Sequence, residues 1–335
     1  MKQTSQHIGF TICSNNYLGQ ANALRHSFLK HNPSYEFYFI VIDQPSDRVN
    51  YEELLPGKVI FIADIDGVDI LSLAAKYDII ELNTCVKPSV FKYLMTNNPH
   101  VESMYYLDPD LYFYDSLEDC SNILKTASMT LTPHIFSEIE RDGLLPEENT
   151  FLNFGIYNLG FIGVNTKHQE TIKMLDWWEQ RTLEHGYNNI SKGYFVDQLW
   201  MNFAPLFYKD VHILESRGYN MGPWNLHERK VEKIDKDGAW LDDQSKLIFY
   251  HFSKIAQDDT AVSREYDRFT LLDFPLLARL YAGYKKDLET FRFYEYKEVP
   301  IAYNVGSWRQ KKEIKRSAVK RFIRRLAKKM IKKTE

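Results

Sequence analysis

Two carboxylates lie two positions apart near the middle of the chain, directly after a short apolar run. The run is MYYL at residues 104–107, and Asp108, Pro109 and Asp110 follow it. A buried strand that ends in Asp-x-Asp presents hard oxygen ligands at the edge of a sheet, and Mg²⁺ and Mn²⁺ prefer such ligands. Pro109 fixes its own φ and biases Asp108 toward an extended conformation, which restricts the geometry of the pair. The motif therefore indicates a site for a divalent cation that accompanies a diphosphate.

The same three residues are also typical of an ordinary turn, because proline and aspartate are both common in turns. Two more Asp-x-Asp triplets occur in the chain, Asp64/Asp66 and Asp235/Asp237, and a glycine follows each of them directly. That glycine favours a turn at both places. The local pattern at Asp108 and Asp110 leaves a metal site and a plain turn equally open. The rest of the chain has to decide between them.

Composition indicates an ordinary globular protein. The chain has 335 residues, of which 44% are hydrophobic and 26% are charged, and this length suits one large domain or two. Aromatic residues reach 15%, which suits clefts as well as cores. The three cysteines, Cys13, Cys85 and Cys120, have no metal-binding spacing and are odd in number, which predicts a reducing compartment. No apolar stretch is long enough to span a membrane, so we expect a cytoplasmic protein.

The net charge of −3 conceals a strong asymmetry along the chain. Residues 309–335 carry 13 Lys/Arg and 2 Asp/Glu, whereas residues 1–308 carry 29 basic and 43 acidic side chains, a net charge of −14. A basic tail on an acidic body predicts a separate role for the tail. The acidic body argues against a broad nucleic-acid-binding surface.

The first 110 residues alternate between strand and helix patterns. Strands are predicted at residues 8–12, 37–42, 59–62 and 104–107, and helices at residues 17–30, 70–77 and 89–95. Further strands are predicted at residues 129–132, 160–164 and 247–250, and further helices at residues 166–183 and 195–204. This order predicts an α/β fold with a mixed, mainly parallel sheet flanked by helices. Ligands of such sheets bind beyond the carboxyl ends of the strands, where residues 14–16 and Asp108 both lie.

Four motifs occur in order along this plan. They are LDPD at residues 107–110, YNLGFI at residues 157–162, Asp197-Gln198 with Asn202, and FYHF at residues 249–252. Together they resemble the sugar-nucleotide-dependent glycosyltransferases of the GT-A fold, nearest to the glycogenin-like and bacterial lipopolysaccharide galactosyltransferase-like group. Residues 218–226 (GYNMGPWNL) also look like the Tyr-Asn loop of bacterial relatives. The chain departs from the group at Leu199 and after Lys254, which leaves the stereochemistry and the sugar open.

The resemblance implies a GT-A catalytic domain at residues 1–254. A helical extension is expected at residues 255–308, and the charge pattern sets apart a basic amphipathic tail at residues 309–335. It implies Mn²⁺ or Mg²⁺ held by Asp108, Asp110 and His251. Taken alone, a single histidine at a strand end is more often structural.

Further site residues follow from the same resemblance. Those implied to bind the nucleotide sugar are Thr11, Asn15, Lys87, Asn158 and Lys254, and those implied to be catalytic are Gln198 and Asp197. Without the resemblance, Lys87 is equally well a surface lysine ahead of Pro88. His134 and Trp224 are placed on the acceptor side, with core packing as the alternative for both.

We therefore expect a retaining, Mn²⁺- or Mg²⁺-dependent transfer of sugar from a nucleoside-diphosphate sugar, a UDP-sugar by resemblance. The expected acceptor is a glycan or a lipid-linked glycan in bacterial surface polysaccharide synthesis. One alternative is a sugar-phosphate nucleotidyltransferase, but SNNY at residues 14–17 is not the glycine-rich phosphate loop that such an enzyme needs. Another is a nucleic-acid binder that acts through the tail.

The tail has a pattern of its own. Between residues 314 and 331, apolar pairs alternate with basic pairs, as in Phe322-Ile323 followed by Arg324-Arg325. A strongly basic, moderately apolar helix is typical of an anchor on anionic lipid. We expect the protein to lie peripherally on the inner face of the cell membrane. A helix packed on the acidic body and a nucleic-acid-binding arm are the alternatives.

Overall fold

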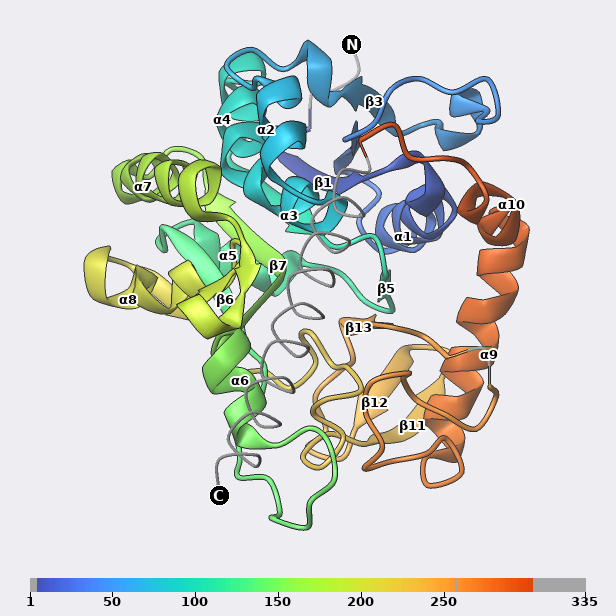
Figure 1. Ribbon diagram of the computed structural model, residues 1–335. Helices are drawn as coiled ribbons and strands as arrows, with labels where there is room; N and C mark the ends of the chain where they lie inside the picture. Colours follow the sequence, from blue (N-terminus) through green and yellow to red (C-terminus); the bar gives the residue numbers. More distant parts are fainter. Residues whose placement is uncertain (1–4, 257, 304–335) are drawn as a thin grey trace, which may run out of the picture.

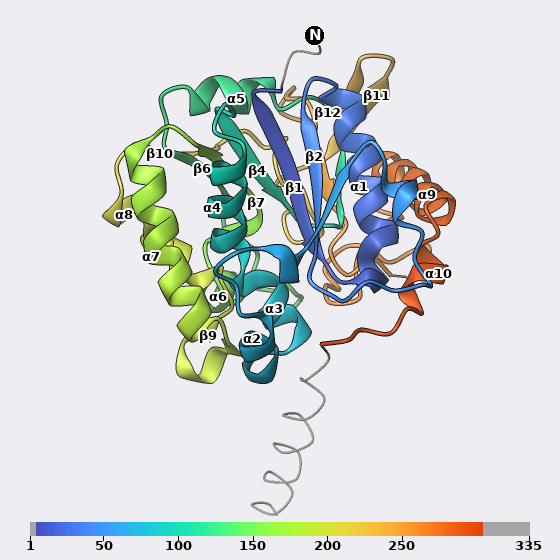
Figure 2. The same ribbon diagram turned by 90° about the horizontal axis from the view of Figure 1, so that it is seen from above.

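A seven-stranded sheet forms the centre of the molecule (Figures 1 and 2). The structure is a computed structural model that describes residues 5–256 and 258–303. The strand order of the sheet is β10-β6-β7-β4-β1-β2-β3. The strands are β1 His7–Cys13, β2 Glu36–Val41, β3 Lys58–Phe61, β4 Ser103–Leu107, β6 Met129–Pro133, β7 Tyr157–Asn165 and β10 Val211–Ile213. All neighbours pair in parallel except β7, which runs antiparallel to both β4 and β6. The predicted α/β fold with a mixed, mainly parallel sheet is confirmed.

Helices cover both faces of this sheet, which is why its central strands are apolar on both sides. The helices are α1 Leu18–His31, α2 Ile70–Lys76, α3 Ile79–Cys85, α4 Lys87–Asn97, α5 Glu118–Leu124, α6 Glu148–Phe154, α7 Gln169–His185, α8 Ala204–Phe207, α9 Pro275–Thr290 and α10 Phe293–Lys297. One face packs against α4 and α7, for example through Phe91 and Trp178. The other packs against α1 and α5, for example through Phe28 and Cys120.

The helix predictions need correction. Helices α3, α5 and α6 were not predicted; the start of α3 is fixed by a capping box in which Asp78 and Glu81 satisfy each other's backbone N–H groups. The single helix predicted at residues 195–204 is wrong in its first half. The chain there forms the short strand β9 (Tyr194–Phe195) and a 3-10 turn (Leu199–Phe203) before α8 begins. Val196 has a φ of +40°, which no α-helix can accommodate.

A smaller layer of strands lies beside the carboxyl end of the main sheet (Figure 1). Strands β5 (Leu111–Phe113) and β13 (Phe249–His251) pair antiparallel, and so do β11 (Val231–Asp235) and β12 (Gly238–Leu241). Two residues, Asn188–Asn189, form β8 and pair with β9.

The helical extension packs onto this layer. Tyr281 and Tyr284 of α9 share a buried cluster with Tyr250 and Phe252 from around β13. The expected basic tail, residues 309–335, lies outside the described residues. Among the residues that the structure describes, no helix is long and apolar enough to cross a membrane.

Candidate active site

Asp108, Asp110 and His251 come together where three strands meet. Asp108 follows β4 directly and donates its backbone N–H to Gly160 of β7, with an N···O distance of 2.7 Å. The antiparallel pairing of β5 with β13 sets His251 opposite Leu111, the residue after Asp110. The Nε2 atom of His251 lies 3.0 Å from Oδ1 of Asp110 and 3.8 Å from Oδ2 of Asp108. One ligand atom from each of the three lies within 4.8 Å of the others, which suits one metal ion.

Asn220 fixes the orientation of the His251 ring. Its amide nitrogen donates to Oγ1 of Thr132 at 2.8 Å, so its amide oxygen faces the imidazole and accepts from Nδ1 of His251 at 3.1 Å. Asn220 adopts a φ of +55°, a left-handed conformation that asparagine tolerates better than most residues. The remaining ring nitrogen, Nε2, therefore points at the two carboxylates. Such support of a ligand histidine by a second residue is typical of metal sites.

The electrostatics of the group also fit a cation. Burial raises the pKa of Asp110 and lowers that of His251, but their mutual attraction outweighs burial in both cases. The pKa of Asp110 therefore lies below its usual value and that of His251 above it. A divalent cation between these groups would replace the proton on Nε2. These residues thus match the ligand set expected for Mn²⁺ or Mg²⁺.

Gly160 makes the close approach of these ligands possible. A Cβ at this position would lie 2.5 Å from Cε1 of His251, 2.8 Å from Oδ2 of Asp108 and 2.8 Å from Oδ1 of Asn158. Real Cβ atoms do not approach other atoms this closely, so any side chain would push the ligands apart.

Replacement of Gly160 by alanine is therefore expected to weaken Mn²⁺ binding about 10- to 100-fold, the range seen when the support of a metal ligand is disturbed. Titration of the protein with Mn²⁺, followed by electron paramagnetic resonance, measures this directly. Gly283→Ala is the matched control, because a Cβ at Gly283 meets no atom within 4 Å. Equal Mn²⁺ affinity in the two variants would contradict the role given to Gly160.

Lys87 and Asp197 form a buried ion pair beside the metal-binding group. The Nζ atom of Lys87 lies 2.9 Å from Oδ2 of Asp197, donates to the backbone oxygen of Leu159 at 3.1 Å, and lies 4.0 Å from Oδ1 of Asp108. Lys87 is only 2% exposed and Asp197 only 1%, which excludes a surface lysine. Burial raises the pKa of Asp197, and the Lys87 ammonium offsets part of that rise. Whether Lys87 also reaches a nucleotide sugar stays a prediction.

Asn158 and Gln198 lie next to this group, but their amides bind other parts of the protein. Oδ1 of Asn158 accepts from the Gly160 N–H, and its Nδ2 lies 3.1 Å from Nε2 of His134. Oε1 of Gln198 accepts from the Leu159 N–H, and its Nε2 donates to the Phe154 oxygen, both at 2.9 Å. Both side chains hold the start of β7 in place. Their predicted contacts with the donor sugar stay predictions.

The other residues assigned to the nucleotide sugar occupy two separate places. Thr11 is buried within β1, and its hydroxyl has no hydrogen-bond partner in the described part of the chain. The Asn15 side chain, beyond the end of β1, donates to the Gln44 oxygen and accepts from the Tyr51 hydroxyl. Lys254 follows His251 and has a side chain that is 46% exposed, 3.7 Å from Oε1 of Glu265. Their nucleotide contacts also stay predictions.

Sequence reasoning missed two residues near the metal-binding group, Tyr17 and Arg264. Burial is the largest cause of the raised pKa of the Tyr17 hydroxyl. The negative charge of Asp110 raises this pKa further, and the positive charge of Arg264 lowers it. The backbone N–H of Arg264 donates to the Lys254 oxygen at 3.0 Å, which holds this loop beside β13. Among the described residues, no ion pair engages the Arg264 guanidinium. No short motif surrounds Arg264, so only the fold could bring it here.

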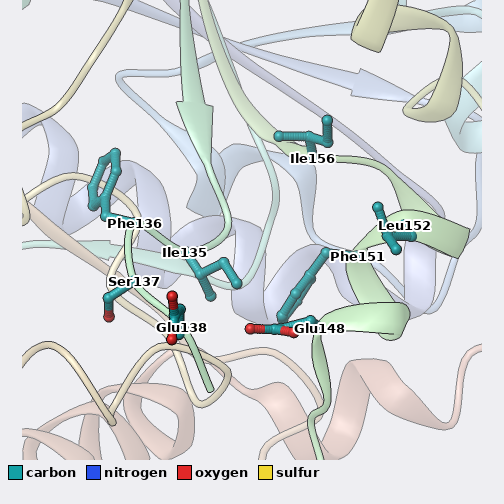
Figure 3. A pocket seen from close by; sticks show the side chains of 8 residues that line it. All are labelled: Ile135, Phe136, Ser137, Glu138, Glu148, Phe151, Leu152 and Ile156. Atoms are coloured by element: carbon teal, nitrogen blue, oxygen red, sulfur yellow. The ribbon is translucent and has the colours of Figure 1, made fainter. Parts of the chain in front are cut away.

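A cleft of about 900 Å³ opens next to β6 and α6 (Figure 3). Its lining residues are Ile135, Phe136, Ser137, Glu138, Glu148, Phe151, Leu152 and Ile156. Phe151 stacks on His134 with 4.9 Å between ring centroids, and Trp224 contacts both His134 at 5.6 Å and His251 at 5.1 Å. Burial lowers the pKa of His134 to about 4, so this ring is neutral at physiological pH. His134 and Trp224 therefore lie between the metal-binding group and the cleft.

Comparison with known proteins gives uncharacterised relatives and distant structural neighbours. No family model matches the chain. The uncharacterised protein YfnF of Bacillus subtilis (strain 168) is 27% identical over 281 residues, 81% of this chain and 89% of that protein. The uncharacterised protein YfnD of the same organism is 26% identical over 254 residues, 72% of this chain and 76% of that protein.

Among solved structures, the galactosyltransferase LgtC in complex with donor and acceptor sugar analogues has a TM-score of 0.46 and 14% identity, over 85% of this chain and 95% of that one. The glycosyltransferase GlyE of Streptococcus pneumoniae TIGR4 has a TM-score of 0.47 and 15% identity, over 90% of this chain and 66% of that one.

Proposed function

We propose that this protein is a metal-dependent glycosyltransferase that moves a sugar from a nucleoside-diphosphate sugar to an acceptor. The observation that carries the proposal is the convergence of Asp108, Asp110 and the oriented His251 at the carboxyl end of a mainly parallel sheet. A divalent cation bound there would act as a Lewis acid that neutralises the negative charge growing on the leaving diphosphate. Four sequence motifs of this enzyme class contribute to the same site.

The chain's own residues supply the rest of the electrostatic environment. The Lys87 ammonium lies 4.0 Å from Asp108 and so partly balances the carboxylates that face the donor. Arg264 has no ion-pair partner in the described part of the chain and, like Asp110, lies near enough to Tyr17 to act on the pKa of its hydroxyl. Guanidinium groups bind phosphate oxygens well, because their donors match the geometry of those oxygens. Arg264 and Lys254, which are both exposed, are thus the two basic side chains that we propose for holding the diphosphate.

The finer assignments belong to the same proposal. The donor is a UDP-sugar and the reaction retains the anomeric configuration, with Gln198 and Asp197 at the sugar. The acceptor is a glycan or a lipid-linked glycan of a bacterial surface polysaccharide. A nucleotidyltransferase is disfavoured because the segment after β1 is the 3-10 turn Asn15–Tyr17 rather than a glycine-rich loop.

A panel of nucleoside-diphosphate sugars tests the proposal. The wild-type protein with Mn²⁺ is incubated with UDP-, GDP- and dTDP-linked hexoses, and release of each nucleoside diphosphate is measured. We expect release from at least one UDP-sugar. No release from any donor with either Mn²⁺ or Mg²⁺ would refute the function. The anomer of the product, determined by NMR, then tests retention and with it the place of Gln198.

Peripheral membrane binding is the part of the proposal that depends on residues 309–335. Each Lys or Arg near an anionic bilayer contributes about 1 kcal/mol, so the tail should bind such a surface in a salt-dependent way. We expect the full-length chain to cosediment with vesicles containing phosphatidylserine at low salt, and a chain ending at Trp308 to remain in the supernatant. Equal sedimentation of both chains, or of neither, would contradict the anchor.

A further inference from the structure

The cleft beside the metal-binding group has an unusual combination of walls. Aromatic and aliphatic side chains make most of its surface, and two carboxylates and one hydroxyl complete it, without any basic side chain (Figure 3). Leu152 is 72% exposed and Ile156 48% exposed, so the apolar surface continues outward from the cleft. Apolar surface left open in this way next to a catalytic group usually marks a binding site.

One wall of the cleft is fixed by a buried ion pair. The Glu228 carboxylate accepts hydrogen bonds from the backbone N–H groups of Phe136 and Ser137 and from the Ser137 hydroxyl. Arg229 holds Glu228 in turn, with 3.2 Å between Nε and Oε1, and both residues are buried. The wall therefore needs no rearrangement to receive a ligand, which is how most small-molecule sites are built.

The two carboxylates of the cleft, Glu138 and Glu148, have oxygen atoms that accept few or no hydrogen bonds from the described residues. Glu138 is exposed, and no ion pair or hydrogen bond joins its side chain to another described residue. Glu148 accepts only the Ile139 N–H among the described residues, at 3.2 Å from Oε1. Figure 3 shows the Glu148 side chain extending from α6 toward Glu138. Both carboxylates can thus accept hydrogen bonds from a ligand that lies against Phe151.

Two buried side chains, His134 and Trp224, connect the cleft to the metal-binding group. Phe151, His134, Trp224 and His251 form a continuous series of ring contacts between the cleft and this group. The indole N–H of Trp224 is buried and has no hydrogen-bond acceptor among the described residues.

We infer that this cleft binds the acceptor, and that the acceptor places there a sugar that is uncharged or carries an amine, and not a phosphate or a carboxylate. The inference rests on the proposed function and specifies its second substrate. The apolar C–H face of a sugar packs against aromatic rings, while its hydroxyl or ammonium groups donate to carboxylates. An anionic sugar would face Glu138 and Glu148, and none of the residues that line the cleft is a cation that could compensate, so the site discriminates by repulsion. A lipid-linked acceptor must therefore keep its phosphates outside the cleft.

Binding to a glycan array tests this inference. The labelled full-length protein, with Mn²⁺ and UDP, is applied to glycans that end in a neutral hexose, in a hexosamine with a free amine, or in a uronic acid or a sugar phosphate. We expect binding to neutral or amine-bearing glycans and roughly tenfold or weaker binding to the anionic ones. Glu138→Gln should weaken binding of amine-bearing glycans by roughly tenfold, and Glu138→Lys should favour anionic ones.

Glu140→Gln is the matched control, because Glu140 is exposed on the same segment but does not line the cleft. It should bind the array as the wild type does. Anionic glycans bound as tightly as neutral ones, no change in the Glu138 variants, or no glycan bound at all would each overturn the inference. Donor cleavage is measured separately. If the wild type releases nucleoside diphosphate but binds no glycan on the array, the acceptor assignment is wrong and the proposed function stands.

Discussion

Replacement of Asp110 by asparagine is expected to lower the rate of nucleoside-diphosphate release about a thousandfold while the protein stays folded. The substitution keeps the size of the side chain but removes the charge that faces Nε2 of His251 at 3.0 Å. A Lewis-acidic cation stabilises the transition state by several kcal/mol, and about 4 kcal/mol corresponds to a thousandfold in rate. Initial rates with a UDP-sugar and saturating Mn²⁺ measure the loss, and thermal unfolding checks the fold.

The chain supplies its own control for this experiment. Asp64 and Asp66 form another Asp-x-Asp triplet, and both side chains are exposed, outside the group formed by Asp108, Asp110 and His251. Asp66→Asn should therefore keep the wild-type rate. If Asp110→Asn and Asp66→Asn have the same rate, the metal-binding role of Asp110 is wrong.

Replacement of Lys87 by methionine is expected to lower the free energy of unfolding by about 3–5 kcal/mol, because it leaves the Asp197 carboxylate buried without its ionic partner. Asp197 is 1% exposed and lies 2.9 Å from the Lys87 ammonium. It also follows Val196, whose φ of +40° is unfavourable for a β-branched residue. Urea unfolding of the two proteins measures the difference. The double variant Lys87→Met/Asp197→Asn should recover much of the loss, since no uncompensated charge remains.

Lys92 provides the comparison on the same helix. Its ammonium pairs with Asp176 at 2.8 Å and Glu179 at 2.7 Å, but its side chain is 40% exposed. Exposed ion pairs contribute about 0–1 kcal/mol, so Lys92→Met should change stability little. A loss of stability with Lys87→Met no larger than with Lys92→Met would mean that the buried pair does not stabilise the fold.

The convergence of Asp108, Asp110 and His251 is the part of the candidate site that could best be predicted from the sequence. Asp108 and Asp110 stand directly after a strong strand pattern, which places them at the carboxyl end of the sheet, whereas His251 was assigned to the same group only by the family resemblance. The local pattern could not separate Asp108/Asp110 from Asp64/Asp66. Only the pairing of β5 with β13, which joins segments far apart in sequence, brings a histidine to the first pair.

Residues that depend on tertiary packing could not be predicted in the same way. From the sequence alone, Lys87 was equally well a surface lysine ahead of Pro88. A cation at a helix N-terminus is not stabilised by the helix dipole, so its position at the start of α4 gave no sign of burial. Its ionic partner Asp197 lies 110 residues later in the chain, and no local pattern predicts that the two residues pair. Arg264 has the same origin, because it reaches the site on a loop whose course only the folded chain defines.

Metal dependence of donor cleavage tests the central claim most directly. The full-length protein is freed of metal with EDTA, dialysed, and assayed for nucleoside-diphosphate release from a UDP-sugar while Mn²⁺ is added back. We predict no release in the metal-free protein and recovery that saturates with Mn²⁺ in the wild type but not in Asp110→Asn. Full release by the metal-free protein, or equal recovery in both proteins, would contradict a cation held by Asp108, Asp110 and His251.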